Sequence, residues 1–323
     1  MNALIEMREL IALSVDGVII RGTYHRPPAE ALSWQREPEE QTSIGILFLS
    51  GLYATRASTG DAAVGWADAF AEEGYHCFRI DLPGYGDSDG DPPEDWLGFI
   101  NRGGYAQVTA AIVKQLIRRY SLNSLILAGH CAGATTAIYS AETIGAECAG
   151  LILIEPYFHL AQEAKPNIRQ ELRVWAERSR LGGALSGLFR AAKQVLQLAG
   201  RRTLPANANV PLLQCWIRLC YRGVPILVLQ APARHARGKG NAPGHFDYMQ
   251  YAMNVAGAAC QLELRMIEQA NHSFSNSAGR HSASKAMQNW LFRHFPRRRP
   301  GSPTASLPVK FYRQHDLPAI AMQ

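Results

Sequence analysis

A tight turn between an apolar run and a helix-forming run constrains this chain more than any other feature. Residues 125–128 read Leu-Ile-Leu-Ala, and they lead into Gly-His-Cys-Ala-Gly at residues 129–133. The two glycines allow a sharp turn where flanking side chains would not fit. This is the strand–turn–helix pattern of a nucleophile elbow, with Cys131 where serine is usual. We therefore expect Cys131 to project above the end of a buried strand.

The remaining cysteines lack the context of Cys131. None of the six cysteines forms a CxxC pair, so the spacing favours neither a zinc site nor a disulfide framework. Cys131 alone would lie at a helix N-terminus, where the helix field favours the reactive thiolate. Four others lie in or beside apolar runs and are expected to be small buried residues: Cys77, Cys148, Cys215 and Cys220.

Composition indicates a globular protein. Of 323 residues, 47% are hydrophobic and 19% charged, and no run approaches the roughly 20 apolar residues of a membrane span. The N-terminal residues lack the basic-then-apolar order of a signal peptide, which predicts a cytoplasmic location. The net charge of +6 comes largely from local arginine clusters. Without a recognisable nucleic-acid-binding fold or aromatic platforms, these clusters indicate a solvated basic face and no nucleic-acid partner.

The hydrophobic pattern predicts an α/β fold with a mostly parallel sheet. Residues 8–15 and 18–25 alternate around Asp16-Gly17, as in an antiparallel hairpin. Short apolar strands separated by helices favour a parallel sheet covered on both faces. The predicted buried strands are 44–49, 76–80, 124–128, 151–154, 225–230 and 261–267. The predicted helices are 61–73, 105–120, 132–144 and 282–295.

The pattern changes in the second half of the chain. Residues 157–222 are rich in Arg, Leu and Ala and contain no clear strand, which predicts a helical lid insert. The lid would lie over the carboxyl ends of the strands, where open α/β sheets bind ligands. It would divide the core into residues 1–156 and 223–296. Residues 297–323 are expected to form a basic, flexible tail.

Four motifs occur in an informative order. Ser50-Gly51-Leu52 follows an early strand, residues 81–88 read Asp-Leu-Pro-Gly-Tyr-Gly-Asp-Ser, the cysteine elbow follows, and His272 lies in Asn-His-Ser-Phe after the last strand. Together these motifs resemble the α/β-hydrolase superfamily, over most of residues 8–295. The cysteine elbow is similar to that of dienelactone hydrolases and polyhydroxyalkanoate synthases. With the 81–90 segment and the histidine motif, it also resembles exosortase-associated hydrolases of bacteria.

This resemblance implies a role for each matching residue. Cys131 would attack an acyl carbon, while His272 would take the thiol proton and later protonate the leaving group. The backbone N–H groups of Leu52 and Ala132 would form the oxyanion hole. His130 is expected to shape the pocket, because adjacent side chains at an elbow point apart.

The sequence leaves open which acid would orient His272. The superfamily normally supplies it just after the penultimate strand, but residues 231–244 contain no Asp or Glu. Glu155 ends the preceding strand and is slightly favoured over Asp247, which follows the long loop. A Cys–His dyad is the third possibility, since a thiolate–imidazolium pair depends less on an acid than serine does.

These residues predict a hydrolase acting on an ester, lactone or thioester through an acyl-cysteine intermediate. Its partner would be a small-molecule acyl substrate, either free or linked to a carrier or coenzyme A. An acyltransferase with an alcohol or amine acceptor is one alternative. A non-catalytic binding scaffold is the other, motivated by the missing acid and by Ser50 in place of histidine. No cofactor or metal is predicted, because the histidines lack paired ligand spacing. The oligomeric state is not predicted.

Overall fold

The computed structural model describes residues 7–32, 43–160, 205, 207–232, 247–256 and 260–296. The chain divides into two compact units, one of residues 1–157 with 211–323 and one of residues 158–210. Most of the predicted lid, and all of the predicted tail at 297–323, lie outside the described residues. Within the described part of the second unit, an isolated antiparallel bridge joins His159 to Ala208.

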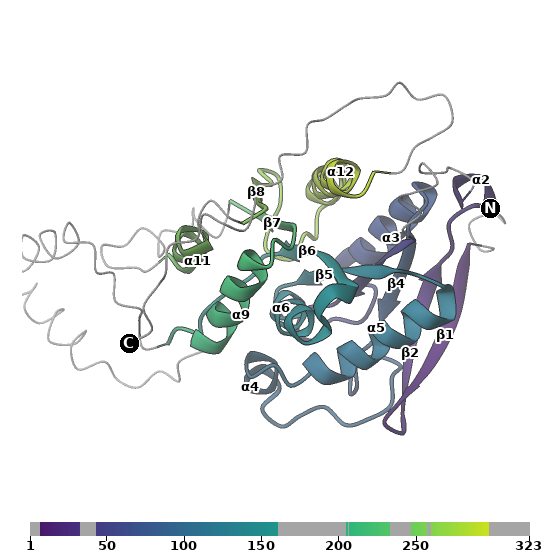
Figure 1. Ribbon diagram of the computed structural model, residues 1–323, viewed down its shortest axis with the longest axis horizontal. Coiled ribbons are helices and arrows are strands. Elements are labelled where there is room, and N and C mark those ends of the chain that lie inside the picture. Colours follow the sequence, from purple (N-terminus) through teal and green to yellow (C-terminus); the bar gives the residue numbers. More distant parts are fainter. Residues whose placement is uncertain are drawn as a thin grey trace, which may run out of the picture. The chain divides into compact units, whose positions relative to one another are not determined.

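The first unit contains an eight-stranded sheet (Figure 1). Its strands are β1 (Arg8–Val15), β2 (Val18–His25), β3 (Ile44–Leu49), β4 (His76–Ile80), β5 (Ser124–His130), β6 (Cys148–Ile154), β7 (Ile226–Gln230) and β8 (Leu262–Met266). They lie in the order β1-β2-β4-β3-β5-β6-β7-β8. The β1–β2 and β2–β4 pairs are antiparallel, and all other pairs are parallel. The predicted fold, a mostly parallel sheet with an N-terminal hairpin, is confirmed.

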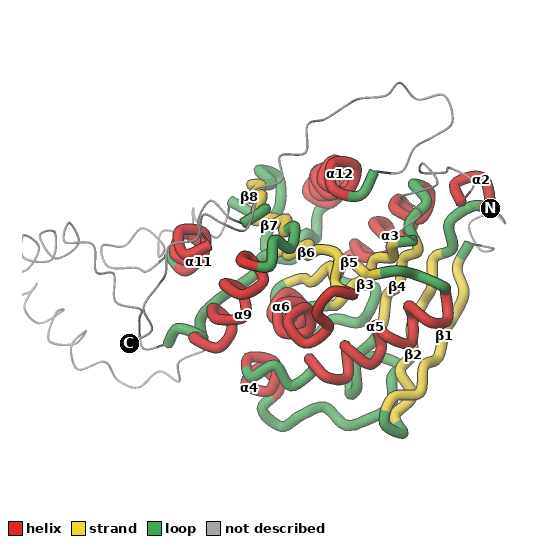
Figure 2. The backbone as a smooth tube through the Cα atoms, viewed as in Figure 1, coloured by secondary structure: helices red, strands yellow, loops and turns green. Residues whose placement is uncertain are grey.

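Helices cover both faces of this sheet. The described helices are α2 (Ala29–Leu32), α3 (Ala62–Glu72), α4 (Trp96–Asn101), α5 (Ala106–Tyr120), α6 (Ala132–Ile144), α9 (Val210–Tyr221), α11 (Tyr248–Ala256) and α12 (Ser277–His294). Figure 2 shows α3 and α12 on one side of the sheet, and α5 and α6 on the other. Helices on both faces are what parallel strands require, because both sides of such strands are apolar.

Burial follows from this layering. Every residue of β3 and β7 is buried, whereas β1 alternates between exposed and buried positions. On one face, Phe70 of α3 and Trp290 of α12 are fully buried against the central strands. The central strands therefore form the buried centre of the fold, and the loops described below follow their carboxyl ends.

Some boundaries differ from the sequence prediction. Strand β6 begins at Cys148, three residues earlier than expected, and α12 begins at Ser277 instead of residue 282. The Asn276 side chain explains the earlier helix start, because it caps α12 by accepting a hydrogen bond from the Gly279 N–H at 2.7 Å. Helices α4 and α11 were not predicted. They have only 6 and 9 residues, too few for a clear helical period.

Candidate active site

The predicted strand, tight turn and helix are present around Cys131. Strand β5 ends at His130, α6 begins at Ala132, and Cys131 between them has a φ of 52°. A Cβ atom on Gly129 would collide with the Gly133 carbonyl, and one on Gly133 would collide with the Leu49 carbonyl. Both positions therefore require glycine. The positive φ of a cysteine is a strained conformation, and such conformations gather at functional sites.

Sheet order brings Cys131 next to Glu155. The Cys131 N–H donates to the Ile154 carbonyl at 2.8 Å, and His130 pairs with Ile154 in the β5–β6 register. Glu155 follows Ile154 directly and has a φ of 53°. The nucleophile candidate and the acid candidate thus leave adjacent parallel strands at the same edge of the sheet.

The Glu155 side chain is fully buried, at 0% relative exposure. Its Oε1 accepts a hydrogen bond from the Ala231 N–H at 2.5 Å, just after β7 ends. Its Oε2 lies 3.0 Å from Nδ1 of His272, which donates to it. A buried carboxylate requires such donors, since burial otherwise disfavours its charged form. Sequence reasoning missed Ala231, because a backbone donor has no sequence signature.

His272 lies in the loop between β8 and α12, and its side chain is about half exposed. Hydrogen bonds to the Cys131 thiol and to the Glu155 carboxylate raise the pKa of His272 to about 9, although burial opposes the shift. The same imidazole thus interacts with the sulfur as well as with the carboxylate. At pH 7 a group with this pKa is largely protonated.

His130 is bonded to the loop that carries His272. Its Nε2 lies 2.8 Å from the His272 carbonyl oxygen, so the ring donates to that oxygen. Burial lowers the pKa of His130, which keeps the ring neutral. Its ring also meets the Phe274 ring edge-on, with centroids 6.2 Å apart. The side chain thus braces the histidine loop, in keeping with a pocket-shaping position.

The loop at residues 50–52 lies against the elbow. A Cβ atom on Gly51 would be 3.3 Å from the His130 carbonyl and 3.7 Å from Cβ of Cys131. Leu52 follows in the same turn, which is closed by a hydrogen bond from the Ala54 N–H to the Gly51 carbonyl at 3.2 Å. Ala132 is the first residue of α6, so no carbonyl of that helix accepts from its N–H. The two predicted oxyanion donors therefore lie on adjoining turns.

A buried ion pair lies a few residues beyond this loop. Asp81, at 1% exposure, pairs with the Arg56 guanidinium and accepts from the Arg56 N–H at 2.6 Å. Ser88 closes the motif turn by donating to the Asp81 carbonyl at 2.5 Å. Gly84 and Gly86 have positive φ values of 78° and 46°. These contacts give residues 81–88 a structural role, and they involve Arg56, which the sequence did not single out.

Asp247 occupies a different setting. Its side chain is exposed and accepts from the Gln250 N–H at 2.9 Å, at the start of α11. Carboxylates are favoured there because they satisfy free N–H groups and the helix dipole. The structure therefore brings Glu155, and not Asp247, into contact with His272.

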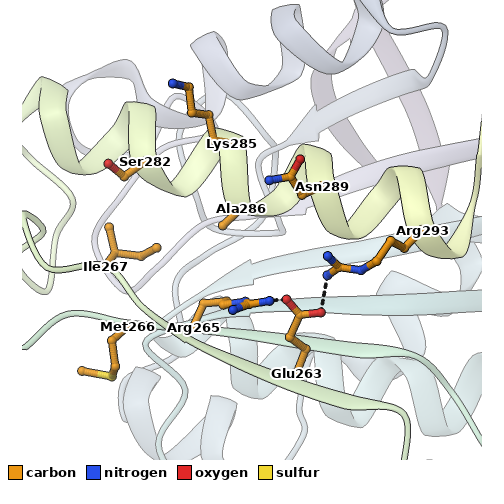
Figure 3. A pocket seen from close by; sticks show the side chains of 9 residues that line it. All are labelled: Glu263, Arg265, Met266, Ile267, Ser282, Lys285, Ala286, Asn289 and Arg293. Carbon is orange, nitrogen blue, oxygen red and sulfur yellow. Dashed lines mark hydrogen bonds and ion pairs between the residues drawn. The ribbon is translucent and has the colours of Figure 1, made fainter.

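A cavity of about 400 Å³ lies between β8 and α12, away from the residues just described. In Figure 3 the Arg265 and Arg293 side chains converge on Glu263, while the Lys285 amine points away from them. This cluster ties β8 to α12.

Among the described residues, no group of three or more His, Cys, Asp or Glu side chains could hold a metal ion. No described helix combines the length and apolarity needed to cross a bilayer.

Comparison with known proteins agrees with this architecture. A family model described as alpha/beta hydrolase fold matches residues 46–287. The chain belongs to this family. The matched region includes the elbow, the Glu155 strand and the His272 loop, so the site lies inside the part of the chain that defines this alpha/beta hydrolase.

Individual proteins similar to this chain share only a small part of its sequence. The lysophosphatidylserine lipase ABHD12 of Danio rerio is 26% identical over 167 residues, which cover 51% of this chain and 41% of that protein. The chain thus matches about two fifths of the length of this curated relative.

Among solved structures, an esterase of Pyrococcus furiosus is similar with a TM-score of 0.56 and 13% identity, covering 89% of this chain and 91% of its own. The thioesterase domain from the curacin biosynthetic pathway has a TM-score of 0.50 and 18% identity, covering 87% and 99%. At these identities the likeness shows the fold alone.

Proposed function

We propose that the protein hydrolyses an ester, lactone or thioester through an acyl-Cys131 intermediate. The observation that carries this proposal is the hydrogen bond between buried Glu155 and His272 beside the elbow that presents Cys131, whose thiol is the main cause of the raised pKa of His272. A nucleophile, a base and a group that orients the base are the parts of a catalytic triad. The lipase similar to this chain takes its name from acyl-bond cleavage, which supports the same reaction class.

Acylation would begin from a thiolate–imidazolium pair. The sulfur of Cys131 attacks the acyl carbon, a C–S bond forms, and the carbonyl oxygen becomes an oxyanion. The N–H groups of Leu52 and Ala132 would stabilise that charge from adjoining turns. The protonated His272, held by Glu155, gives its proton to the leaving oxygen or sulfur as the bond to the acyl carbon breaks.

Deacylation would use the same histidine as a base. Once Cys131 carries an acyl group, its thiol hydrogen bond, the main cause of the raised pKa of His272, is gone. The pKa of the imidazole then falls, and His272 can take a proton from water. The resulting hydroxide attacks the acyl carbon, the C–S bond breaks, and the acid is released while the thiolate returns.

The test is to trap the intermediate on the whole chain. Brief exposure to p-nitrophenyl esters and acyl thioesters of different chain length is followed by intact-protein mass and peptide mapping. We expect an added acyl mass on Cys131 that is absent from Cys131→Ala and strongly reduced in His272→Gln. No adduct, together with alkylation of Cys131 at the rate of a surface thiol, would favour a binding scaffold instead.

The same experiment separates hydrolysis from transfer. If the adduct decays and free acid appears in buffer alone, water is the acceptor. If the adduct persists until an alcohol or amine is added, the protein is an acyltransferase. In both cases the acyl groups that load onto Cys131 define the substrate class.

His130 provides a prediction about positioning. We expect His130→Leu to lower kcat/KM for a reactive ester by about tenfold, because it removes one hydrogen bond to the His272 loop. His130→Gln keeps an N–H donor and should recover part of that loss. The comparison requires kinetics and a thermal melt of each variant. Equal activity of His130→Leu and the parent protein would show that this bond does not position His272.

A further inference from the structure

Two cysteines outside the proposed active site lie in direct contact. The Sγ atoms of Cys220 and Cys260 are 2.7 Å apart, although 40 positions separate the two residues in sequence. Cys220 is buried in the last turn of α9, and Cys260 is partly exposed just before β8. Both are free thiols. A small side-chain rotation would bring the sulfurs to the disulfide bond length of about 2.05 Å.

We propose that Cys220 and Cys260 are a modification site at which hydrogen peroxide forms a reversible disulfide. This inference goes beyond the proposed hydrolysis and does not depend on Cys131. The sequence did not suggest it, because the two cysteines follow no spacing rule and meet only when α9 packs near the edge of the sheet.

The environment assigns a different role to each sulfur. The hydrogen bond between them lowers the pKa of Cys260 and raises that of Cys220. Cys260 is therefore the better thiolate, and it is also the more exposed of the two. By contrast, burial raises the pKa of Cys148 to about 12 and also raises that of Cys215. These two cysteines should react slowly with the same oxidant.

The chemistry balances in two steps. The Cys260 thiolate attacks one oxygen of the peroxide, the O–O bond breaks, and a sulfenic acid and water result. The Cys220 sulfur then attacks the sulfenic sulfur, so the S–S bond forms and the S–O bond breaks, releasing a second water. Two thiols are oxidised and one peroxide is reduced. Dithiothreitol reverses the reaction by thiol–disulfide exchange.

The Cys220–Cys260 disulfide would cross-link a part of the core that contacts Glu155, the proposed acid. It closes residues 220–260 into a loop that contains β7 and Ala231, whose N–H holds Glu155. The Trp216 Nε1–H of α9 already donates to the Ala252 carbonyl of α11 at 2.9 Å, so α9 is tied to this segment in the reduced state as well. A disulfide should therefore stabilise the existing packing without requiring a rearrangement.

The test uses the full chain with Cys131→Ser, so that oxidation of the proposed nucleophile does not interfere. Of the six cysteines this variant keeps five. After hydrogen peroxide treatment and alkylation under denaturing conditions, we expect three alkylated cysteines and the loss of two hydrogens. Trypsin should release residues 219–222 linked to residues 240–265. The oxidised form should melt about 5 °C or more above the reduced form, and dithiothreitol should reverse both changes.

Matched variants make the result decisive. Cys220→Ser and Cys260→Ser should each abolish the linked peptide and the rise in Tm. Cys215→Ser, on the same helix, should leave both unchanged. Five alkylated cysteines after peroxide, a linked peptide with another cysteine, or oxidation of Cys260 to sulfinic acid without a cross-link would each overturn the proposal.

Discussion

Cys131→Ala is expected to lower kcat/KM for an activated ester by about 10⁴-fold or more, the usual cost of removing a catalytic nucleophile. The fold should survive, because alanine is smaller than cysteine and the turn around residue 131 is held by backbone hydrogen bonds to Ile154 and Ala134. Kinetics with p-nitrophenyl esters and a thermal melt measure the two properties. A variant that keeps its melting temperature and at least a tenth of the parent activity would remove Cys131 from the reaction.

Cys131→Ser is the informative companion to this variant. Serine fits the same turn, but its hydroxyl is not ionised near neutral pH and needs a base. Loss of the thiol also removes the main cause of the raised pKa of His272. We therefore expect some activity to remain, and its pH profile to follow a histidine that titrates below that of the parent protein.

The sheet could be predicted closely, because its signals are local. Strands β3 and β4 match their predicted residues, since each is a continuous apolar run with a clear end. The hairpin turn was also predictable. Asp16 and Gly17 have φ values of 49° and 82°, the positive angles that such a two-residue turn requires.

The site was predictable only where a motif is local. Cys131 and His272 each lie in a short pattern next to a strand end, so sequence alone could propose both. The partner of His272 could not be chosen in this way. Glu155 lies 117 positions away, and the contact exists because β6 lies between β5 and β7 in the sheet. Strand order is a property of the whole fold, and no window of sequence contains it.

Glu155, the proposed acid, should affect activity and its pH dependence together. Glu155→Gln is expected to lower kcat/KM by about 10²-fold or more. A glutamine amide has one acceptor oxygen, whereas the carboxylate accepts from both Ala231 and His272. If the amide oxygen keeps the Ala231 N–H, the NH₂ group faces Nδ1 of His272. That nitrogen must then act as an acceptor, which places the proton of the neutral imidazole on Nε2. A histidine protonated there cannot take a second proton as a base through Nε2.

The pH profile of Glu155→Gln distinguishes a changed His272 from a general loss of folded structure. In the parent protein His272 has a pKa of about 9, so loss of the imidazolium should lower kcat/KM above about pH 9. Glu155 is one of the groups that raise this pKa, and its replacement should therefore move the alkaline limb to lower pH.

Asp247→Asn is the matched control, because Asp247 caps α11 and its replacement should change neither the alkaline limb of the pH profile nor kcat/KM. If Asp247→Asn moves the limb and Glu155→Gln does not, Asp247 is the acid. If neither variant changes it, a Cys131–His272 dyad is sufficient, because the interaction with Cys131 alone then maintains the raised pKa of the imidazole.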